Sequence, residues 1–231
     1  LGSAIDADFQ LAGRAYVYIR FKRISKKWRD GLPQNLWFKV KGRKVYDPRT
    51  TSTGYSANWA LCFRDYLISV GGVSNQYFDA SQMIAAANVC DEEVAIAGGG
   101  VQARYEMNGA FSTELSARDT ISDWCRQGGN LRGLVMAGDK LMILPGAYSA
   151  PVADFAEADM VEPLKLTGET LVEDRFDAVA GTFLMETRKY NAVEFKRVTF
   201  DDYAGNPEDA RVMYLDFTRE TNGRRAQRLG L

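Results

Sequence analysis

Hydrophobic and polar side chains alternate along residues 14–23, where Val17 and Ile19 fall on the side opposite Tyr18 and Arg20. A period of two predicts a strand with one face buried. The run NLWFKVKGRKVY that follows predicts two further strands around a tight turn at Gly42. After Asp-Pro-Arg, the polar stretch TTSTGYS predicts a loop of about linker length. The first part of the chain is therefore expected to be β-rich.

Helical periodicity replaces this alternation between residues 57 and 128, and three capped runs predict three short helices. Ser56 or Asn58 is the expected cap of the first helix, and Asp79 that of the second. Ser116 and Asp119 form the pattern of a capping box, with Asp in place of Glu, before the third. Glycines at 71–72, 98–100 and 128–129 are expected to end the three helices in turn. The expected inward residues are Ala60, Phe63, Leu67 and Val70 in the first helix, Met83, Ile84, Ala87 and Val94 in the second, and Thr120, Ile121, Trp124 and Cys125 in the third.

Strand patterns return on either side of the third helix. QARYEMN predicts a short strand before it, and LRGLVMAGDKLMILPG predicts a hairpin that turns at Gly138-Asp139. Beyond Pro151 the segments PVADF, PLKLT, DAVAGTFL, NAVEFKRVTF and ARVMYLDF predict strands, with a helical turn at EADM. The last residues, NGRRAQRLGL, predict the beginning of a helix.

These patterns together predict an α+β fold of mostly antiparallel sheets and small barrel-like units. We expect a basic β-rich segment over residues 1–50 and an α+β domain over 51–150. A β-rich subdomain with a truncated C-terminal helix is expected over 151–231. No apolar stretch is long enough to span a bilayer, and the N-terminus lacks the layout of a secretory signal, which favours synthesis in a cytoplasm.

The chain of 231 residues contains no histidine. This removes the commonest general base, the usual nucleophilic triads and the commonest transition-metal ligand. Cys62, Cys90 and Cys125 are odd in number and widely spaced, which fits neither a disulfide framework nor a zinc site. We interpret them as buried helix residues. The sequence therefore predicts a protein without catalytic residues, cofactor or metal.

Four local clusters could in principle carry chemistry, but each favours a simpler interpretation. Gly98–Gly100 fits no phosphate-binding motif. The acidic loop at 201–209 could chelate calcium but lacks EF-hand spacing. Residues 91–93 are interpreted as an exposed helix face, and the acids flanking Arg175 as surface ion pairs. A carboxylate pair of the glycosidase kind stays open, because its separation is a property of the fold.

The charge is spread unevenly along the chain. Net charge is −1, but residues 1–50 carry twelve Lys/Arg and four Asp/Glu, and the remainder carries seventeen and twenty-six. Such asymmetry suggests a partner surface. Basic residues interleaved with aromatics are typical of a protein interface, of a single-stranded nucleic-acid platform, or of a solvated outer face over a core. The candidate interface residues are Arg20, Lys22, Lys26, Lys27, Trp28, Trp37, Lys39, Lys41, Arg43 and Lys44.

An ordered set of segments carries a resemblance to a known family. VKGRKVYDPR and NWALCFRDYLIS come first, followed by FDASQMIAAANVCDE and RYEMNGAFSTELSARDTISDWC. GDKLMILPGAY, FDAVAGTF and AQRLGL complete the set. In this order they resemble the tail-tip host-specificity proteins of lambda-like, long-tailed bacteriophages, which are central tail fibre or tail hub proteins. SARDTISDWC…GDKLMILPG is also similar to the capped-helix-plus-hairpin unit of contractile-tail hub proteins. Cys125 departs from the family pattern.

The resemblance implies an internal piece of a threefold tail hub, upstream of receptor recognition and without catalytic residues. It implies a structural homotrimer at the tail tip of a phage or prophage virion, with other tail proteins as partners. The oppositely charged parts of the chain are candidates for contacts between neighbouring copies. A nucleic-acid-binding module that uses the basic N-terminal β-face is the alternative, and a cell-wall glycan hydrolase is a third interpretation.

Overall fold

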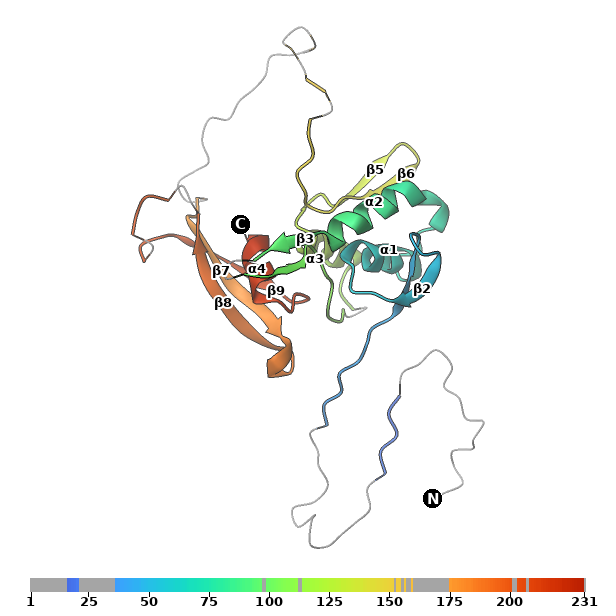
Figure 1. The fold of residues 1–231 in the computed structure, drawn as a ribbon, viewed down its shortest axis with the longest axis horizontal. Helices are drawn as coiled ribbons and strands as arrows, with labels where there is room; N and C mark the ends of the chain where they lie inside the picture. Colours follow the sequence, from blue (N-terminus) through green and yellow to red (C-terminus); the bar gives the residue numbers. More distant parts are fainter. Residues whose placement is uncertain are drawn as a thin grey trace, which may run out of the picture. The chain divides into compact units, whose positions relative to one another are not determined.

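The computed structural model describes residues 16–20, 36–96, 99–111, 114–151, 153, 154, 156, 159, 175–200, 203–206 and 208–230 (Figure 1). The chain divides into two compact units, Leu1–Val40 and Lys41–Leu231. No helix among the described residues is long and apolar enough to cross a membrane. The boundaries expected at residues 50 and 150 stay predictions.

The described part of the first unit contains no strand. Tyr16–Arg20 and Leu36–Val40 are exposed and take no regular secondary structure. The strand predicted over 14–23 is therefore wrong where the structure describes it, and so is the strand before Gly42. Alternation marks a strand only when a neighbouring strand supplies the hydrogen-bond ladder, and these segments have no such neighbour among the described residues.

The second unit opens with a hairpin whose turn lies later than the sequence indicates. Strand β1 (Lys44–Asp47) pairs antiparallel with β2 (Ser52–Tyr55). The turn is therefore at residues 48–51 and not at Gly42, and the expected loop TTSTGYS contains β2. Asp47 starts this turn by accepting the backbone N–H of Arg49 at 2.9 Å, the Asx pattern that makes Asp a turn residue.

The three predicted helices are confirmed, together with their caps. They are α1 (Trp59–Ser69), α2 (Ala80–Asp91) and α3 (Ala117–Gln127), with the 3-10 turn η1 (Asn75–Tyr77) between the first two. Asn58 Oδ1 accepts the N–H of residue 61 at 3.2 Å, and Asp79 Oδ1 accepts that of residue 82 at 2.9 Å. Ser116 Oγ accepts that of residue 119 at 3.1 Å. Each side chain thus satisfies one donor that the helix start leaves open.

The expected end of the second helix is wrong. Helix α2 ends at Asp91, and the chain continues as β3 (Glu93–Ala95), which pairs antiparallel with β4 (Val101–Ala103). Val94 is thus a strand residue. Gly99 and Gly100, with φ of 94° and 96°, lie in the turn between the two strands. The glycines provide the positive φ of a hairpin turn, a role that composition does not distinguish from a helix stop.

Helices α1 and α3 meet in an aromatic core. Phe63 and Trp124 stack with ring centroids 5.4 Å apart, and Trp59 Nε1 donates to the carbonyl of Trp124 at 2.7 Å. Gly128 ends α3 against Trp59, because a Cβ there would lie 2.3 Å from the indole ring. Of the residues expected inside, Val70 caps the C-terminus of α1 and is exposed, and Ile84, Val94 and Ile121 are only half-buried.

The hairpin predicted at Gly138-Asp139 is confirmed. Strands β5 (Leu134–Ala137) and β6 (Lys140–Ile143) pair antiparallel, and Gly138 takes a φ of 62° at the turn. The amide of Gln82 on α2 donates to the carbonyl of Ile143 at 2.6 Å. The hairpin is thus held against α2.

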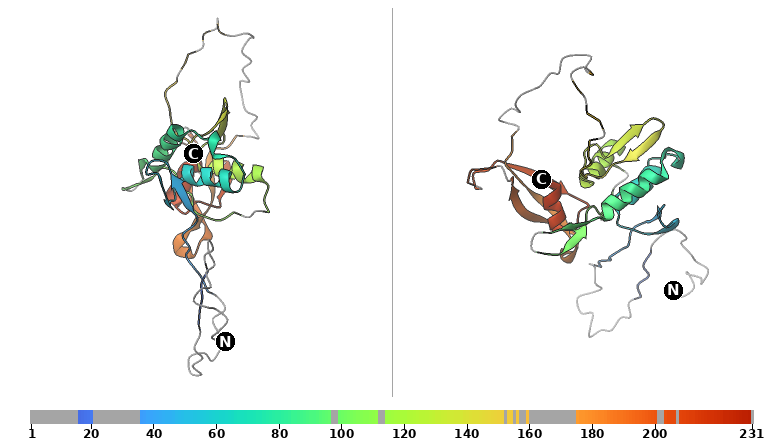
Figure 2. Two further views of the ribbon diagram at one scale, coloured as in Figure 1. Left: turned by 90° about the vertical axis from the view of Figure 1, so that its right-hand side faces the viewer. Right: turned by 45° about the horizontal axis from the view of Figure 1, so that its top comes forward.

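The C-terminal region forms a three-stranded sheet with a helix on one face (Figures 1 and 2). Its elements are β7 (Ala178–Met185), the 3-10 turn η4 (Glu186–Arg188), β8 (Asn191–Thr199), β9 (Val212–Phe217) and α4 (Gly223–Gly230). The strand order in the sheet is β8-β7-β9, and η4 connects β7 to β8. β7 pairs antiparallel with β8 but parallel with β9. The α+β class is confirmed, and the described strands close no barrel. Pro151, Ala153 and Asp154 take no regular secondary structure, so the strand predicted at PVADF is wrong where the structure describes it. PLKLT lies outside the described residues, and so does EADM apart from Asp159.

A second small core lies between this sheet and α4. It contains Phe183, Phe195 and Phe217 from the three strands and Ala226 from the helix. Leu229 of α4 packs against this core and also against the helical core. The predicted C-terminal helix is therefore confirmed, and it contributes to both apolar clusters.

Candidate interaction surface

The β1–β2 hairpin has one buried and one exposed face. Val45 is 4% exposed and belongs to the helical core. Because side chains alternate across a strand, Lys44 and Tyr46 lie on the other face. The register pairs Lys44 with Tyr55 and Tyr46 with Thr53, and all four are exposed. The hairpin therefore presents a cation and two tyrosines to solvent.

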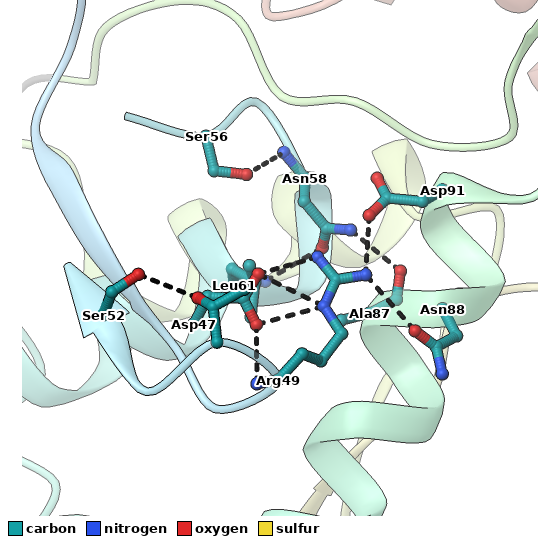
Figure 3. Close-up of polar contacts among 10 residues, drawn as sticks. Asp47, Arg49, Ser52, Ser56, Asn58, Leu61, Ala87, Asn88 and Asp91 are labelled. Carbon is teal, nitrogen blue, oxygen red and sulfur yellow. Dashed lines mark hydrogen bonds and ion pairs between the residues drawn. The ribbon is translucent and has the colours of Figure 1, made fainter. Parts of the chain in front are cut away.

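Arg49 fixes the hairpin turn to the end of α2 (Figure 3). Its Nη2 lies 2.8 Å from Asp47 Oδ2, and its Nη1 lies 2.7 Å from Asp91 Oδ2. Nη1 also donates to Asn88 Oδ1 at 3.3 Å. The hydrogen bonds from Arg49 lower the pKa of Asp47, and those to Asp47 and Asp91 raise the pKa of Arg49. The guanidinium thus links the turn to the helix by charge-assisted hydrogen bonds.

Asn58 fixes the other end of the hairpin, where β2 leads into α1 (Figure 3). It is 3% exposed, and its side-chain amide donates to the carbonyl of Ala87 on α2 at 2.8 Å. Its backbone N–H donates to Ser56 Oγ at 3.1 Å. Both ends of the hairpin are therefore held on α2, so its exposed face is rigidly presented.

Cations lie over both exposed tyrosines. Lys41 Nζ is 5.5 Å from the centroid of the Tyr55 ring, and the Arg64 guanidinium of α1 is 5.4 Å from that of Tyr46. Exposed contacts of this kind contribute about 0.5–1 kcal/mol each. Among the described residues, no side-chain hydrogen bond or ion pair of Lys44 is found. We call Lys41, Lys44, Tyr46, Tyr55 and Arg64 the cationic tyrosine face.

Carboxylates neutralise the other basic residues nearby. Arg43 Nε lies 2.8 Å from Asp65 Oδ2, and Arg49 is held by Asp47 and Asp91. The local positive charge is therefore smaller than the composition of residues 1–50 suggests. It is carried by cations whose neighbours are aromatic rings.

The ten predicted interface residues fall into three groups. Lys41, Arg43 and Lys44 come together beside the hairpin. Arg20, Trp37 and Lys39 belong to the first unit, where Trp37 is 65% exposed. The remaining four lie outside the described residues: Lys22, Lys26, Lys27 and Trp28.

Sequence reasoning missed three members of this face. Tyr46 and Tyr55 become neighbours only when the turn is placed at 48–51, and the Asp-Pro pair was the signal for that turn. Arg64 carries no such signal, because its contact with Tyr46 depends on how α1 packs against β1.

Two of the acidic clusters noted in the sequence, residues 91–93 and the acids around Arg175, form ion pairs with arginines. Asp91 is the last residue of α2 and binds Arg49, and Glu92 Oε2 lies 2.8 Å from Arg104 Nη2. Residues 91–93 are exposed as expected, but the expectation that all three lie along a helix is wrong, because α2 ends at Asp91 and β3 begins at Glu93. Asp177 pairs with Arg211 at 3.0 Å. The described residues contain no group of three or more side chains that could hold a metal ion, and Asp201 and Asp202 lie outside them.

The cysteines lie on the three helices as predicted. Cys90 and Cys125 are buried and Cys62 is half-buried, and all three are free. Burial raises the pKa of Cys62 and of Cys90 to about 12. Both thiols are therefore protonated at neutral pH, and the thiolate is the reactive species.

A second polar cluster, which sequence reasoning did not find, surrounds Arg225 of α4. Arg225 is 2% exposed and lies 3.1 Å from Glu220 Oε1 and 2.8 Å from Glu106 Oε2. Its Nε also donates to the carbonyl of Ala103 on β4 at 3.2 Å. Burial raises the pKa of Glu220 to about 6, against the opposing effect of Arg225. The guanidinium lies between the two carboxylates, so their geometry is that of a structural brace.

The sequence matches no protein-family model, and a search of curated proteins finds no relative.

Proposed function

We propose that the chain is a structural, non-enzymatic module of a phage or prophage tail-tip hub. It would form part of the host-specificity protein, assemble as a homotrimer with other tail proteins, and contribute to tail assembly, host attachment and DNA delivery. It would be made in the bacterial cytoplasm and reside at the virion tail tip. The observation that carries the proposal is the ordered set of family-like segments along nearly the whole chain.

The polar chemistry of the fold supports a structural role. Arg49 and Arg225 bind carboxylates from distant segments and hold neighbouring elements together. The hairpin residues of the cationic tyrosine face, by contrast, are exposed, and the hairpin is held on α2 at both ends. Tyrosine and arginine are residues that frequently anchor protein interfaces. The module would thus contribute a contact surface to the hub.

The proposal is tested by deleting the gene from its phage or prophage and examining the particles by electron microscopy. Complementation with the intact gene should restore tails, and gold-labelled antibody should bind the tail tip. Complementation with Lys39, Lys41, Arg43 and Lys44 all changed to Glu should give fewer complete tails. Normal tails and full infectivity without the gene would refute the tail-hub function.

A nucleic-acid-binding module is the second candidate, and the cations over Tyr46 and Tyr55 favour it. Aromatic side chains among cations can stack bases without sequence preference. The pairing of Arg43 and Arg49 with Asp65 and Asp91 favours the structural role instead, because carboxylates inside the patch repel a phosphate backbone. Fluorescence anisotropy with labelled oligo-dT tests this candidate. Salt-sensitive binding that Lys44→Glu abolishes would support it.

A further inference from the structure

The second unit contains two apolar cores that share very little. One includes residues of α1, α2 and α3, and the other lies between the three-stranded sheet and α4. Among the described residues, Leu229 of α4 is the one side chain that packs against both cores. We call the described residues of 44–146 the helical body and those of 177–230 the sheet body.

Polar contacts join the two bodies. Arg225 of the sheet body lies 2.8 Å from Glu106 Oε2 of the helical body. Arg219 forms an ion pair with Asp123 of α3, and its carbonyl accepts the N–H of Asn108 at 3.0 Å. Polar interfaces between parts of one chain resemble transient protein interfaces, and relative motion is their default behaviour. The joint between the bodies is therefore of the kind that can open.

A cleft of about 250 Å³ lies at the same joint. Arg126 and Leu131 line it from the helical body, and Met213 and Leu229 line it from the sheet body. Leu131 is 77% exposed, so apolar surface at this boundary stays in contact with water. Because protein interiors are normally close-packed, the cleft shows that the two bodies are incompletely closed on each other.

Glu220 is a buried carboxylate at this joint. Its Oε1 lies 3.1 Å from Arg225 Nη1 and accepts the backbone N–H groups of residues 221 and 222 at 2.9 and 2.7 Å. Glu220 therefore shares the guanidinium of Arg225 with Glu106. Burial raises the pKa of Glu220 to about 6, although Arg225 opposes this effect. The charged and titratable groups around this cluster are Arg225 and Arg228 of α4 and Arg104, Tyr105 and Glu106 of the helical body.

We propose that the joint between the helical body and the sheet body opens and closes with pH, and that Glu220 is the group that controls it. The joint is closed in acid and opens more often as the pH rises toward neutrality. This inference goes beyond the proposed function and does not depend on it.

The direction follows from proton binding. Opening exposes Glu220 to water, so its pKa returns toward the ordinary 4.5, and between 4.5 and 6 the open state binds fewer protons than the closed state. Closure is therefore most favourable below pH 4.5, and this advantage is lost as the pH rises to 6. The change of pKa from about 6 to 4.5 lowers the equilibrium constant for closure by up to about 30-fold.

Amide hydrogen exchange of the intact chain, followed by NMR spectroscopy, tests the proposal at two adjacent amides. The N–H of Asn108 bonds across the joint to Arg219, whereas that of Met107 bonds to the carbonyl of Ala57 inside the helical body at 2.7 Å. After correction for the intrinsic exchange rate, the protection of Asn108 should fall by up to about 30-fold from pH 4.5 to pH 7. Met107 should stay better protected than Asn108 at every pH, because opening of the joint leaves its bond intact.

Variants separate the role of Glu220 from a general effect of pH. Glu220→Gln removes the titrating group and should make the protection of Asn108 independent of pH. Glu208→Gln is the matched control at an exposed position before β9, and it should keep the pH dependence of the parent. If Glu220→Gln does not fold, Asp123→Asn replaces it. Because Asp123→Asn removes the ion pair with Arg219, it should lower the protection of Asn108 at every pH and leave Met107 better protected.

Two results would overturn the proposal. Equal protection and equal pH dependence of Asn108 and Met107 would show that the two bodies open only by unfolding together. Protection of Asn108 that is constant from pH 4.5 to pH 7, or that varies in Glu220→Gln as it does in the parent, would remove Glu220 from control of the joint. The tail-hub function is tested separately by the phage particles, so it survives either result.

Discussion

Replacing Arg225 with Met should destabilise the fold strongly, and more at pH 8 than at pH 5. Met matches the length of the arginine stem but removes the guanidinium. The substitution leaves Glu220, which is 1% exposed, without its cation. Breaking a buried ion pair by removing one partner costs about 3–5 kcal/mol, because the remaining charge is uncompensated. We expect a loss of that size in the free energy of unfolding at pH 8.

The pH dependence follows from Glu220. Its pKa is about 6 in the folded protein against 4.5 for the free side chain. Between these values the folded state binds more protons than the unfolded state, so stability falls as pH rises from 4.5 to 6 and is then constant. The fall amounts to about 2 kcal/mol in the parent protein. Without Arg225 the pKa of Glu220 rises further, so the fall becomes larger and extends to higher pH.

At pH 5 the variant carries a protonated Glu220, and the remaining loss is that of hydrogen bonds to Glu106 and Ala103, about 1–3 kcal/mol. Urea denaturation followed by tryptophan fluorescence at pH 5, 6, 7 and 8 measures the difference. The double variant Arg225→Met/Glu220→Gln removes both charges and should recover most of the loss at pH 8. Equal losses at pH 5 and pH 8, or a double variant no more stable than the single, would refute this reasoning.

Three further outcomes are expected. Ser116→Ala should lower the free energy of unfolding by about 1 kcal/mol, because it removes the N-terminal cap of α3. Ser122→Ala, on the exposed side of the same helix, should change the free energy of unfolding little. Equal effects of the two substitutions in urea melts would contradict the capping role. Thiol reagents at pH 7 should label Cys62 and Cys90 slowly in the native protein and fully in the unfolded protein, because burial raises the pKa of both thiols to about 12. Rapid stoichiometric labelling of the native protein would contradict that burial. The protein should show no hydrolysis of cell-wall glycan, nucleotide or peptide above blank, and turnover that a single Asp or Glu substitution abolishes would identify an enzyme.

Features decided within a few residues could be predicted from the sequence. The caps at Asn58, Asp79 and Ser116 act on backbone donors only three residues away, so the local pattern contains both partners. The turn at Gly138 is equally local, because it requires a positive φ that glycine adopts easily. These elements establish the α+β class without knowledge of the packing.

Elements stabilised mainly by their neighbours were misplaced. β2 has the sequence STGY, which contains no apolar alternation, and it is a strand because β1 pairs with it. Helix α2 ends before the glycines that seemed to stop it, since residues 93–95 gain a partner in β4. Sheet pairing between separate segments overrides local propensity at both places.

The ion pairs of Arg225 and Arg49, which join distant segments of the unit, could not be predicted for the same reason. Arg225 and Glu106 are 119 residues apart in the chain, and Arg49 and Asp91 are 42 apart. No spacing rule relates such positions. A buried arginine also looks like any other in a sequence, although burial makes its charge partners obligatory.

The ion pairs of Arg43 and Arg49 with carboxylates change how the uneven charge along the chain is interpreted. Counted along the sequence, every lysine and arginine of the first fifty residues contributes equally to a partner surface. In the fold, Arg43 and Arg49 are bound by carboxylates, whereas Lys41 and Arg64 lie over tyrosine rings. A cation over a ring keeps its full charge, because the ring offers only a quadrupole and no countercharge. Lys41 is therefore available to an acidic partner, whereas Arg64 is half-buried and its Nη2 also donates to Asn75 Oδ1. Arg43 is paired with Asp65, whereas Lys44 has no ion pair among the described residues. Arg43→Glu should therefore weaken the binding of an acidic partner less than Lys44→Glu, although the two residues are adjacent in the sequence and carry the same charge.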